Sequence, residues 1–362
     1  MKKGRNLRSV NTDGGVNLQF KLLSAIGIII IVSGHCYHGG MELAYNWFPP
    51  YSYNLALFVF ISGYFYKTDY EENVGKYIWK RTKRLLIPAY LWNIFYGGMV
   101  AFLGLFGFTI GAKPDLYNLF VMPFVDGEAF QYNLGSWFVY PLFLVCIINV
   151  LFRKFLKLIH LDNEFIVLIV YLAIGMIGIN TALENPTAIN GIVKLLVRTM
   201  FFLPCYEFGR FYKAVLEKKD TLNNVAYFAI IFAVQLILLT FCKDLEYTPS
   251  SFTKFNNGFI IPYISSITAI AFWLRVSRLL VPAIGNSKLV RLIADNTYGI
   301  MVNQLVGFMC LKFVFYGLSL ITSGSLFGDF NVASFKSSIW YYYLPNGLQQ
   351  WAFVYLIFGL FV

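Results

Sequence analysis

Two histidines stand at the end of the first long apolar stretch of the chain, residues 20–37, where positions 33–38 read Ser-Gly-His-Cys-Tyr-His. About twenty apolar residues are enough for a helix to cross the hydrocarbon core of a bilayer, so this stretch predicts a membrane span. An ionisable side chain in or beside a span is costly and indicates a function. His35 and His38 are three residues apart and would share one helix face. We expect a functional site here; the alternative is a pair of histidines that only tolerate the headgroup region.

Lys21 and Ser24 extend this feature along the same predicted helix. They precede His35 by 14 and 11 residues, and both separations are close to whole numbers of helical turns. The three side chains would therefore form a polar stripe that faces other helices rather than lipid. The alternative is three unrelated roles: a basic anchor, a small packing residue and an interfacial histidine.

Arg81 and Arg84 lie in a basic cluster before the third apolar run. Their spacing would place both on one helix face, where they could hold a phosphate or pyrophosphate together. Pro88 predicts that a helix begins beside them, and its N-terminus would add to the preference for anions. The same cluster could instead serve only to orient the chain in the membrane.

The composition excludes a soluble globular class, since 58% of the 362 residues are hydrophobic and only 13% are charged. Repeated apolar runs predict an all-α, polytopic helical membrane bundle, and the short alternating segments of a transmembrane barrel are absent. The net charge of +11 comes from short basic clusters between apolar runs, which is a topology signal rather than a nucleic-acid surface. The five scattered cysteines predict neither a metal site nor disulfides.

About ten spans are predicted, at 20–38, 51–67, 86–106, 135–152, 163–181, 192–212, 223–242, 257–275, 294–316 and 339–361. Most Lys and Arg residues then fall on the side of the N-terminus, which places both termini in the cytoplasm. We divide the chain into a cytoplasmic tail, 1–17, and a membrane domain, 18–362, and expect a multi-pass protein of the cell membrane. The longest outer loops, 107–134 and 317–338, could cover a polar ligand.

Other polar residues inside the spans have two interpretations each. Ser62 precedes Gly63 in the second span, where small residues serve either close helix packing or a site. Arg198 and Glu207 lie nine residues apart in the sixth span, so they cannot pair with each other on the helix. Each would either meet a charge from another helix or line the site.

Together, the motifs resemble the membrane acyltransferase-3 family, whose members O-acylate surface sugars. The resemblance rests on a first span ending in His, on Phe-x-Phe-Ile-Ser-Gly-Tyr at 58–64 and on Lys-Arg-x-x-Arg-Leu-x-x-Pro at 80–88. The segments at 135–140 and 207–210 resemble the Trp-Phe-Leu and Phe-x-x-Gly elements of that family. The resemblance covers most of the chain.

The resemblance implies that His35 is the essential histidine and that Arg81 and Arg84 bind the acyl donor, with Lys21 and Ser24 as further donor-binding candidates. The family commonly has Arg where this chain has Ser24; Lys21 would stand in for it, although Lys and Arg are not equivalent at a bidentate site. A late-span histidine of some members is missing, and the ninth span reads Asn-Gln at 303–304 instead. Further residues expected to line the site are His38, Ser62, Trp137, Arg198, Glu207, Asn303 and Gln304.

The implied function is an integral membrane O-acyltransferase that moves acetyl from acetyl-CoA to a sugar hydroxyl of a surface polysaccharide or its lipid-linked precursor. Acetyl-CoA would be a co-substrate, with no bound cofactor, and His35 would act as general base or transient acyl acceptor. The expected partners are acyl-CoA, the glycan or lipid-linked sugar and the lipid bilayer, but no nucleic acid; a homo-oligomer stays open. The main alternative is a transporter of a polysaccharide intermediate, because intramembrane His and Arg also serve proton relays. Arg81 and Arg84 separate the two hypotheses, since export alone does not need a site for CoA phosphates.

Overall fold

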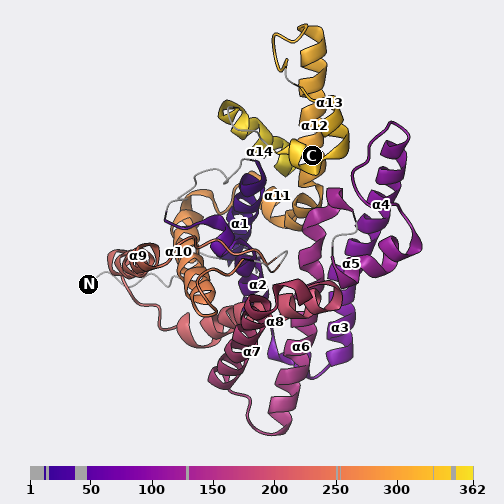
Figure 1. Cartoon of the computed structure of the whole chain (residues 1–362). Coiled ribbons are helices and arrows are strands. Elements are labelled where there is room, and N and C mark those ends of the chain that lie inside the picture. The colour runs from indigo at the N-terminus through magenta and orange to yellow at the C-terminus, as the bar shows by residue number, and fades with distance from the viewer. Residues whose placement is uncertain are drawn as a thin grey trace.

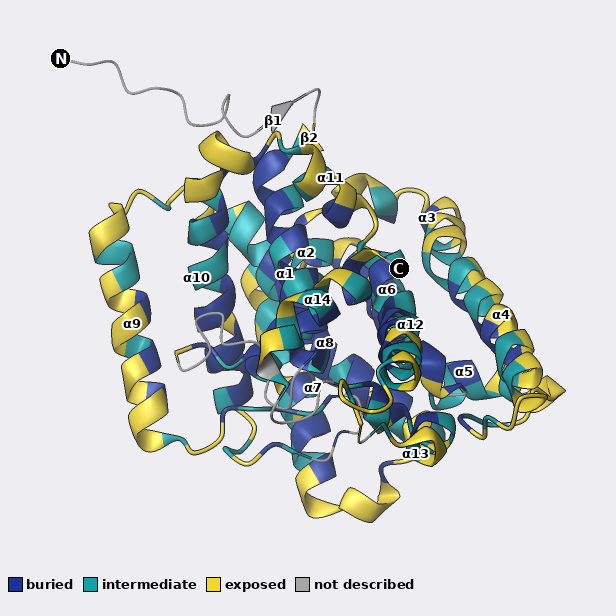
Figure 2. Cartoon of the chain, turned by 90° about the horizontal axis from the view of Figure 1, so that it is seen from above, coloured by how far each residue is buried: buried dark blue, intermediate teal, exposed yellow. Residues whose placement is uncertain are grey.

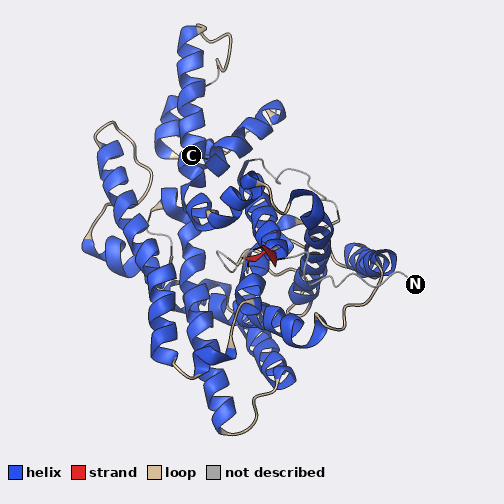
Figure 3. Ribbon diagram, turned by 180° about the vertical axis from the view of Figure 1, so that it is seen from behind, coloured by secondary structure: helices blue, strands red, loops and turns tan. Residues whose placement is uncertain are grey.

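The computed structural model of the chain consists almost entirely of helices (Figures 1 and 3). It describes residues 12–13, 16–36, 47–127, 130–249, 252, 254–328, 330–343 and 348–361. The helices are α1 Leu18–Cys36, α2 Asn54–Tyr64, α3 Val74–Arg81, α4 Ile87–Gly104, α5 Met122–Val125, α6 Val139–Leu158, α7 Glu164–Glu184, α8 Gly191–Phe211, α9 Asn224–Phe241, α10 Ile261–Ile284, α11 Lys288–Asp295, α12 Thr297–Ile321, α13 Val332–Ser337 and α14 Ala352–Phe361. Strands β1 Thr12–Asp13 and β2 Val16–Asn17 form a short antiparallel pair before α1. The predicted all-α membrane bundle is confirmed.

Each of the ten predicted spans contains a helix, but not all of these helices are long and apolar enough to cross a bilayer. Within the described residues, seven are long and apolar enough to do so: Leu18–Cys36, Val74–Gly104, Gln131–Leu158, Glu164–Glu184, Asn224–Phe241, Ile261–Ile284 and Thr297–Ile321. Helix α2 has 11 residues and rises about 16 Å, roughly half the hydrocarbon thickness. Helix α8 carries buried charges, and α14 has only 10 residues. The number of spans and the side of each terminus therefore stay predictions.

Helix α1 lies at the centre of the bundle and contacts α2, α10, α11, α12 and α14. Of its apolar window, 72% is buried inside the protein, against 17% for α9 and 22% for the helix that contains α4. Figure 2 shows this difference, with α9 and α4 largely exposed at opposite edges and α1, α2 and α8 dark in the middle. The helix that carries His35 is thus surrounded by protein rather than by lipid.

Helices α2 and α8 cross in direct backbone contact through a pair of glycines. A Cβ on Gly63 would overlap the carbonyl oxygen of Tyr206, and a Cβ on Gly209 would overlap that of Phe60. Small residues permit this close approach in membrane helices. The packing interpretation of Gly63 is therefore correct, and the neighbouring Ser62 has a separate role described below.

Pro88 does not begin a helix, contrary to our expectation. Residues 74–104 form one continuous apolar helix that starts after the cap Asn73, whose side chain accepts from the Lys76 backbone N–H at 3.4 Å. Proline cannot donate to the carbonyl four residues earlier and clashes with it. A π-helical segment, Thr82–Leu86, precedes Pro88 and accommodates that missing bond. Arg81 and Arg84 consequently lie within a helix and not beside an N-terminus.

The C-terminal part of the chain also differs from the predicted span 339–361. Residues Ile339–Tyr342 form a 3₁₀ turn that contacts α12, and α14 begins only at Ala352. The two long loops meet, because Lys336 Nζ donates to the Phe106 carbonyl oxygen and the Thr109 backbone N–H donates to the Lys336 carbonyl oxygen, both at 2.8 Å. The aromatic run at 339–343 is thereby held against the bundle near the end of α1.

Candidate functional site

His35, half-buried near the end of α1, contacts Gln304 of α12. The ring nitrogen Nδ1 lies 2.8 Å from Gln304 Oε1, and Gln304 Nε2 donates to the Met301 carbonyl oxygen at 3.1 Å. A carbonyl oxygen only accepts, so the amide nitrogen of Gln304 must face Met301 and its oxygen must face His35. His35 Nδ1 therefore carries the proton, and Nε2 of the neutral ring keeps a free lone pair. Such a ring can accept a proton from a hydroxyl group.

Aromatic side chains complete the surroundings of this histidine. Tyr343 meets the His35 ring edge-on, with ring centroids 5.8 Å apart, and Trp340 packs on Tyr343 at 5.4 Å. Tyr51 donates its hydroxyl to the Gly34 carbonyl oxygen at 3.0 Å. His38, the second histidine of the motif, lies outside the described residues.

The polar stripe of α1 faces α11 and α12. Lys21 forms an ion pair with Asp295 at the end of α11. Ser24 donates to the Phe20 carbonyl oxygen of its own helix at 2.8 Å. Lys21 and Ser24 thus lie on the side of α1 from which His35 reaches Gln304, as the helical spacing predicts.

Ser24 lines two cavities. One, of about 360 Å³, opens at the start of α1 and is lined by Val16, Asn17, Phe20, Lys21, Ser24 and Ala294, among others. The second, of about 230 Å³, continues between α1, α2, α6 and α12; its lining includes Ser24, Ser62, Ile31, Phe58, Leu142 and Met301. Ile31 lies four residues before His35, about 6 Å along the helix axis, and Met301 accepts the Gln304 hydrogen bond. The linings of the two cavities thus follow α1 from its N-terminal end to Ile31, a little over one turn before the histidine.

Arg81 and Arg84 occupy different environments. Arg81 is half-buried: its Nε donates to the Tyr77 hydroxyl at 3.0 Å, and its guanidinium stacks over the Tyr77 ring at 5.1 Å. Arg84 is exposed. A π-helical turn contains more residues than an α-helical one. Arg81 and Arg84, three positions apart, therefore do not share one face of the helix. Leu85, which follows Arg84, lines the 230 Å³ cavity.

Arg198 and Trp137 pack together at a different place. The Arg198 guanidinium lies 4.6 Å from the centre of the Trp137 ring. It also donates to two loop carbonyls, those of Asp126 at 2.8 Å and Pro249 at 3.2 Å. Through these contacts, α8 is joined to the 126–127 loop and to the segment that follows α9. Both predicted site residues therefore have a structural role.

Glu207 is buried in an ion network between α6, α7 and α8. Both of its carboxylate oxygens accept from Arg153 Nη2, at 2.8 and 2.9 Å. Arg153 also reaches Glu164 at 2.6 Å, and Glu164 in turn pairs with Arg210 at 2.9 Å. Of the two roles considered for Glu207, the structure supports the pairing with a charge on another helix. Arg153, which follows the predicted span 135–152, is 1% exposed inside α6.

Glu71 lies beside this network, in the short turn before α3 and outside the candidate spans. Tyr66 donates to its Oε1 at 3.1 Å, and Lys157 approaches its Oε2 at 4.0 Å. Burial dominates these favourable contacts and raises the pKa of Glu71 above its usual value.

Asn303 points away from its neighbour Gln304. Its Oδ1 accepts from the Tyr96 hydroxyl of α4 at 2.7 Å, and it lines a separate cavity near the start of α12. Among the described candidates, the structure therefore pairs His35 with Gln304 and places Ser24 and Ser62 in the lining of the inner cavity next to them. Trp137, Arg198, Glu207 and Asn303 lie elsewhere.

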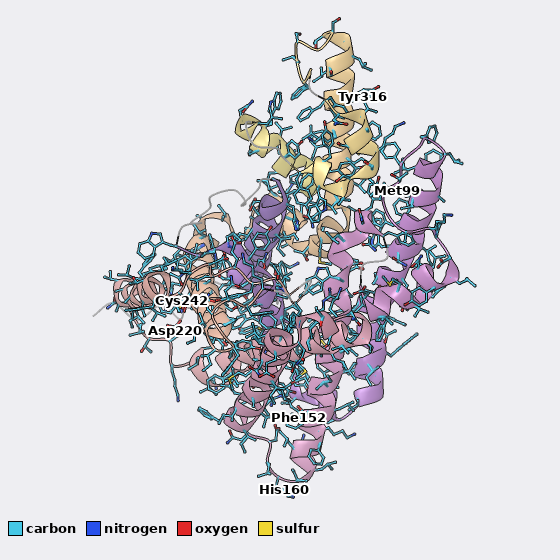
Figure 4. The ribbon with its side chains drawn as sticks, viewed as in Figure 1. Met99, Phe152, His160, Asp220, Cys242 and Tyr316 are labelled. Carbon is cyan, nitrogen blue, oxygen red and sulfur yellow. The ribbon has the colours of Figure 1, made fainter. Side chains whose placement is uncertain are left out.

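Several contacts of the site had no clear signal in the sequence. Asp295 pairs with Lys21 across more than 270 residues, and Tyr343 reaches His35 from a segment predicted to be helical. The third histidine, His160, follows α6; Figure 4 labels it at the end of the view opposite to Tyr316 of α12. His160 is exposed and takes no part in the site.

A match to a known protein family extends over most of the helical bundle. The sequence profile of a family described as an acyltransferase domain matches residues 17–316. No curated protein and no solved structure matches the chain. The matched region runs from the start of α1 into the last turns of α12, so it includes His35, Gln304 and the helices that line the path between them and the N-terminal end of α1. The chain therefore belongs to the acyltransferase-3 family and is a membrane acyltransferase.

Proposed function

We propose that this protein transfers acetyl from cytoplasmic acetyl-CoA to a hydroxyl of a surface polysaccharide or its lipid-linked precursor in the cell membrane. The proposal rests mainly on the His35–Gln304 pair, which lies a little over one helical turn beyond Ile31 in the lining of the inner cavity. That arrangement combines a ring nitrogen ready to accept a proton with a hollow in the bundle close to it. A transferase that joins a soluble donor to an acceptor across a membrane needs both features.

His35 Nε2 would act on the acceptor hydroxyl. It takes the hydroxyl proton while the sugar oxygen attacks the carbonyl carbon of the thioester, and a tetrahedral adduct forms. When the C–S bond breaks, the imidazolium returns its proton to the sulfur of CoA. The products are the sugar ester and free CoA, and the ring regains its starting tautomer. A positioned histidine typically contributes about 10²–10⁴-fold in such a step.

The donor would enter from the N-terminal end of α1. The wider cavity there is lined by Lys21 and Asn17, whereas the inner cavity has mainly apolar walls with Ser24 and Ser62 as its small polar residues. An apolar passage suits the uncharged arm that carries the thioester, and the phosphates would stay outside. Lys21 lines the outer cavity, and the exposed Arg84 precedes Leu85 of the inner one; these two cations would meet the phosphates.

Blocking the passage at Ser62 tests this proposal. The chain in lipid nanodiscs is given acetyl-CoA and a glycan acceptor, and CoA release and ester formation are measured. Ser62→Trp fills the inner cavity and should abolish transfer. Ser62→Ala removes the hydroxyl but keeps the space, so it should transfer like the parent. Equal transfer by the Trp variant would exclude the cavity as the donor path.

A further inference from the structure

Lys312 of α12 is a buried cation for which the described part of the chain supplies no counter-ion. Its side chain is 3% exposed, and its Nζ lies 4.5 Å from the centre of the Tyr341 ring and 5.8 Å from that of Tyr355. Among the described residues, no Asp or Glu pairs with it and no hydrogen bond from its ammonium group is found. Removing an ammonium group from water is costly unless another charge compensates it.

Each of the other buried cations of the described chain has oxygen acceptors. Arg153 binds Glu207 and Glu164, and Arg275 binds Asp220. Arg198 donates to loop carbonyls. Lys312 is the exception to this pattern, and the faces of two tyrosines offset only part of the lost hydration.

The two tyrosines around Lys312 also have hydroxyl protons to donate. The Tyr355 hydroxyl is buried and has no hydrogen-bond partner in the part of the chain described. The Tyr341 hydroxyl accepts from the Asn331 backbone N–H at 2.8 Å, and no acceptor for its own proton is found among the described residues. The ammonium therefore lies beside two tyrosines whose hydroxyl protons have no acceptor among the described residues. A group that complements such neighbours carries negative charge and only accepts hydrogen bonds.

This cluster lies on the same structural units as the His35 site. Lys312 follows Gln304 by eight residues of α12, a little over two turns and about 12 Å along the axis. The short aromatic segment 339–343 contacts both places, since Tyr341 packs on Lys312 and Tyr343 packs on His35. Tyr341 and Tyr355 follow the region matched by the family profile, 17–316, so part of the cluster comes from outside the matched domain.

We propose that Lys312, Tyr341 and Tyr355 bind an anionic group of the acceptor, a carboxylate or phosphate on a sugar close to the one that is acylated. This inference rests on the proposed function, because it takes the reacting hydroxyl to lie at His35. The acceptor is accordingly an acidic glycan or a sugar phosphate, and a neutral glycan of the same length binds more weakly.

Binding without the acyl donor tests the anion site independently of catalysis. The full chain in nanodiscs is titrated separately with a glucuronic-acid disaccharide, glucose 1-phosphate and a neutral glucose disaccharide. Binding is measured by tryptophan fluorescence and by thermal shift. The parent should bind at least one of the two anions more tightly than the neutral sugar, and the anion that binds identifies the source of the charge. Lys312→Met should weaken that binding about tenfold or more and leave the neutral sugar unaffected.

Two further variants separate recognition from folding. Lys312→Arg keeps the charge and should retain most of the anion binding, while Lys336→Met removes a lysine that only joins two loops and should bind like the parent. Removing an uncompensated charge should leave the melting temperature of Lys312→Met equal to that of the parent or higher. Equal anion binding by the parent and Lys312→Met, or no preference of the parent for either anion, would overturn the inference. A parent that binds the anion but transfers no acetyl would contradict the proposed function instead.

Discussion

Replacing Gln304 by leucine isolates the contribution of the His35 tautomer. The substitution removes the acceptor for Nδ1–H, a hydrogen bond worth about 0.5–1.5 kcal/mol net, and leaving that N–H unsatisfied costs about 1–3 kcal/mol more. The ring avoids this cost by turning or by moving its proton to Nε2, and in either case the lone pair no longer faces the acceptor. Since each 1.4 kcal/mol corresponds to about a tenfold change in an equilibrium or rate constant, we expect kcat to fall by about 10- to 100-fold. The KM for acetyl-CoA should not change, because Gln304 does not line the cavity path.

Initial rates of CoA release and ester formation in nanodiscs, measured across pH, provide the assay. Asn303→Leu is the matched control. It also removes a hydrogen-bonding amide from α12, but Asn303 bonds to Tyr96 on another face of the helix, so the kcat of this variant should stay near the parental value. Gln304→Glu keeps an acceptor at Nδ1, and its carboxylate would stabilise the imidazolium. The acidic limb of its kcat profile should therefore move to higher pH. A Gln304→Leu variant with parental kcat and pH profile would refute the positioning role.

Three further predictions concern the donor site and the scaffold. Arg84→Ala should weaken acetyl-CoA binding about tenfold by calorimetry, whereas unchanged affinity would make Arg84 only a topology signal. Glu207→Ala should lower the free energy of unfolding by roughly 3 kcal/mol because Arg153 loses its buried partner; a loss below 1 kcal/mol in denaturant titrations would contradict this. Burial raises the pKa of Glu71 in the folded state, so its contribution to stability is complete below the unfolded value of about 4.3 and is lost as pH rises through the folded value. The melting temperature of the parent relative to Glu71→Gln should therefore fall between pH 4 and pH 8, and a difference independent of pH would oppose the assignment.

Local patterns in the sequence predicted much of the fold. The apolar runs located the helices because hydrophobic length is a local property. The spacing of Lys21, Ser24 and His35 predicted a face turned to other helices, and Lys21 and His35 contact α11 and α12. Gly63 was correctly associated with close packing. These features depend on one helix at a time, so the sequence alone contains them.

The expectations that failed depend on neighbours distant in the chain. The helix through Pro88 continues because a π turn absorbs the missing hydrogen bond, and proline alone does not reveal this. Arg153 follows the predicted span 135–152, and only its contact with Glu207 of α8 shows that it is buried in the bundle. The partnership of His35 with Gln304 joins residues 269 positions apart, so spacing within either helix could not predict it.

The transfer chemistry at His35 is tested most directly by the ester content of the surface glycan. Cells that produce equal amounts of the parent, His35→Gln or His160→Gln are compared for total surface glycan and for O-acetyl groups on it. Glutamine keeps a hydrogen-bonding side chain but cannot shuttle a proton, and His160 is an exposed histidine remote from the site. We predict that His35→Gln exports normal amounts of glycan that lacks the ester, while His160→Gln matches the parent. Near-parental O-acetylation by His35→Gln would contradict base catalysis by this residue, and loss of the glycan itself would favour a transporter.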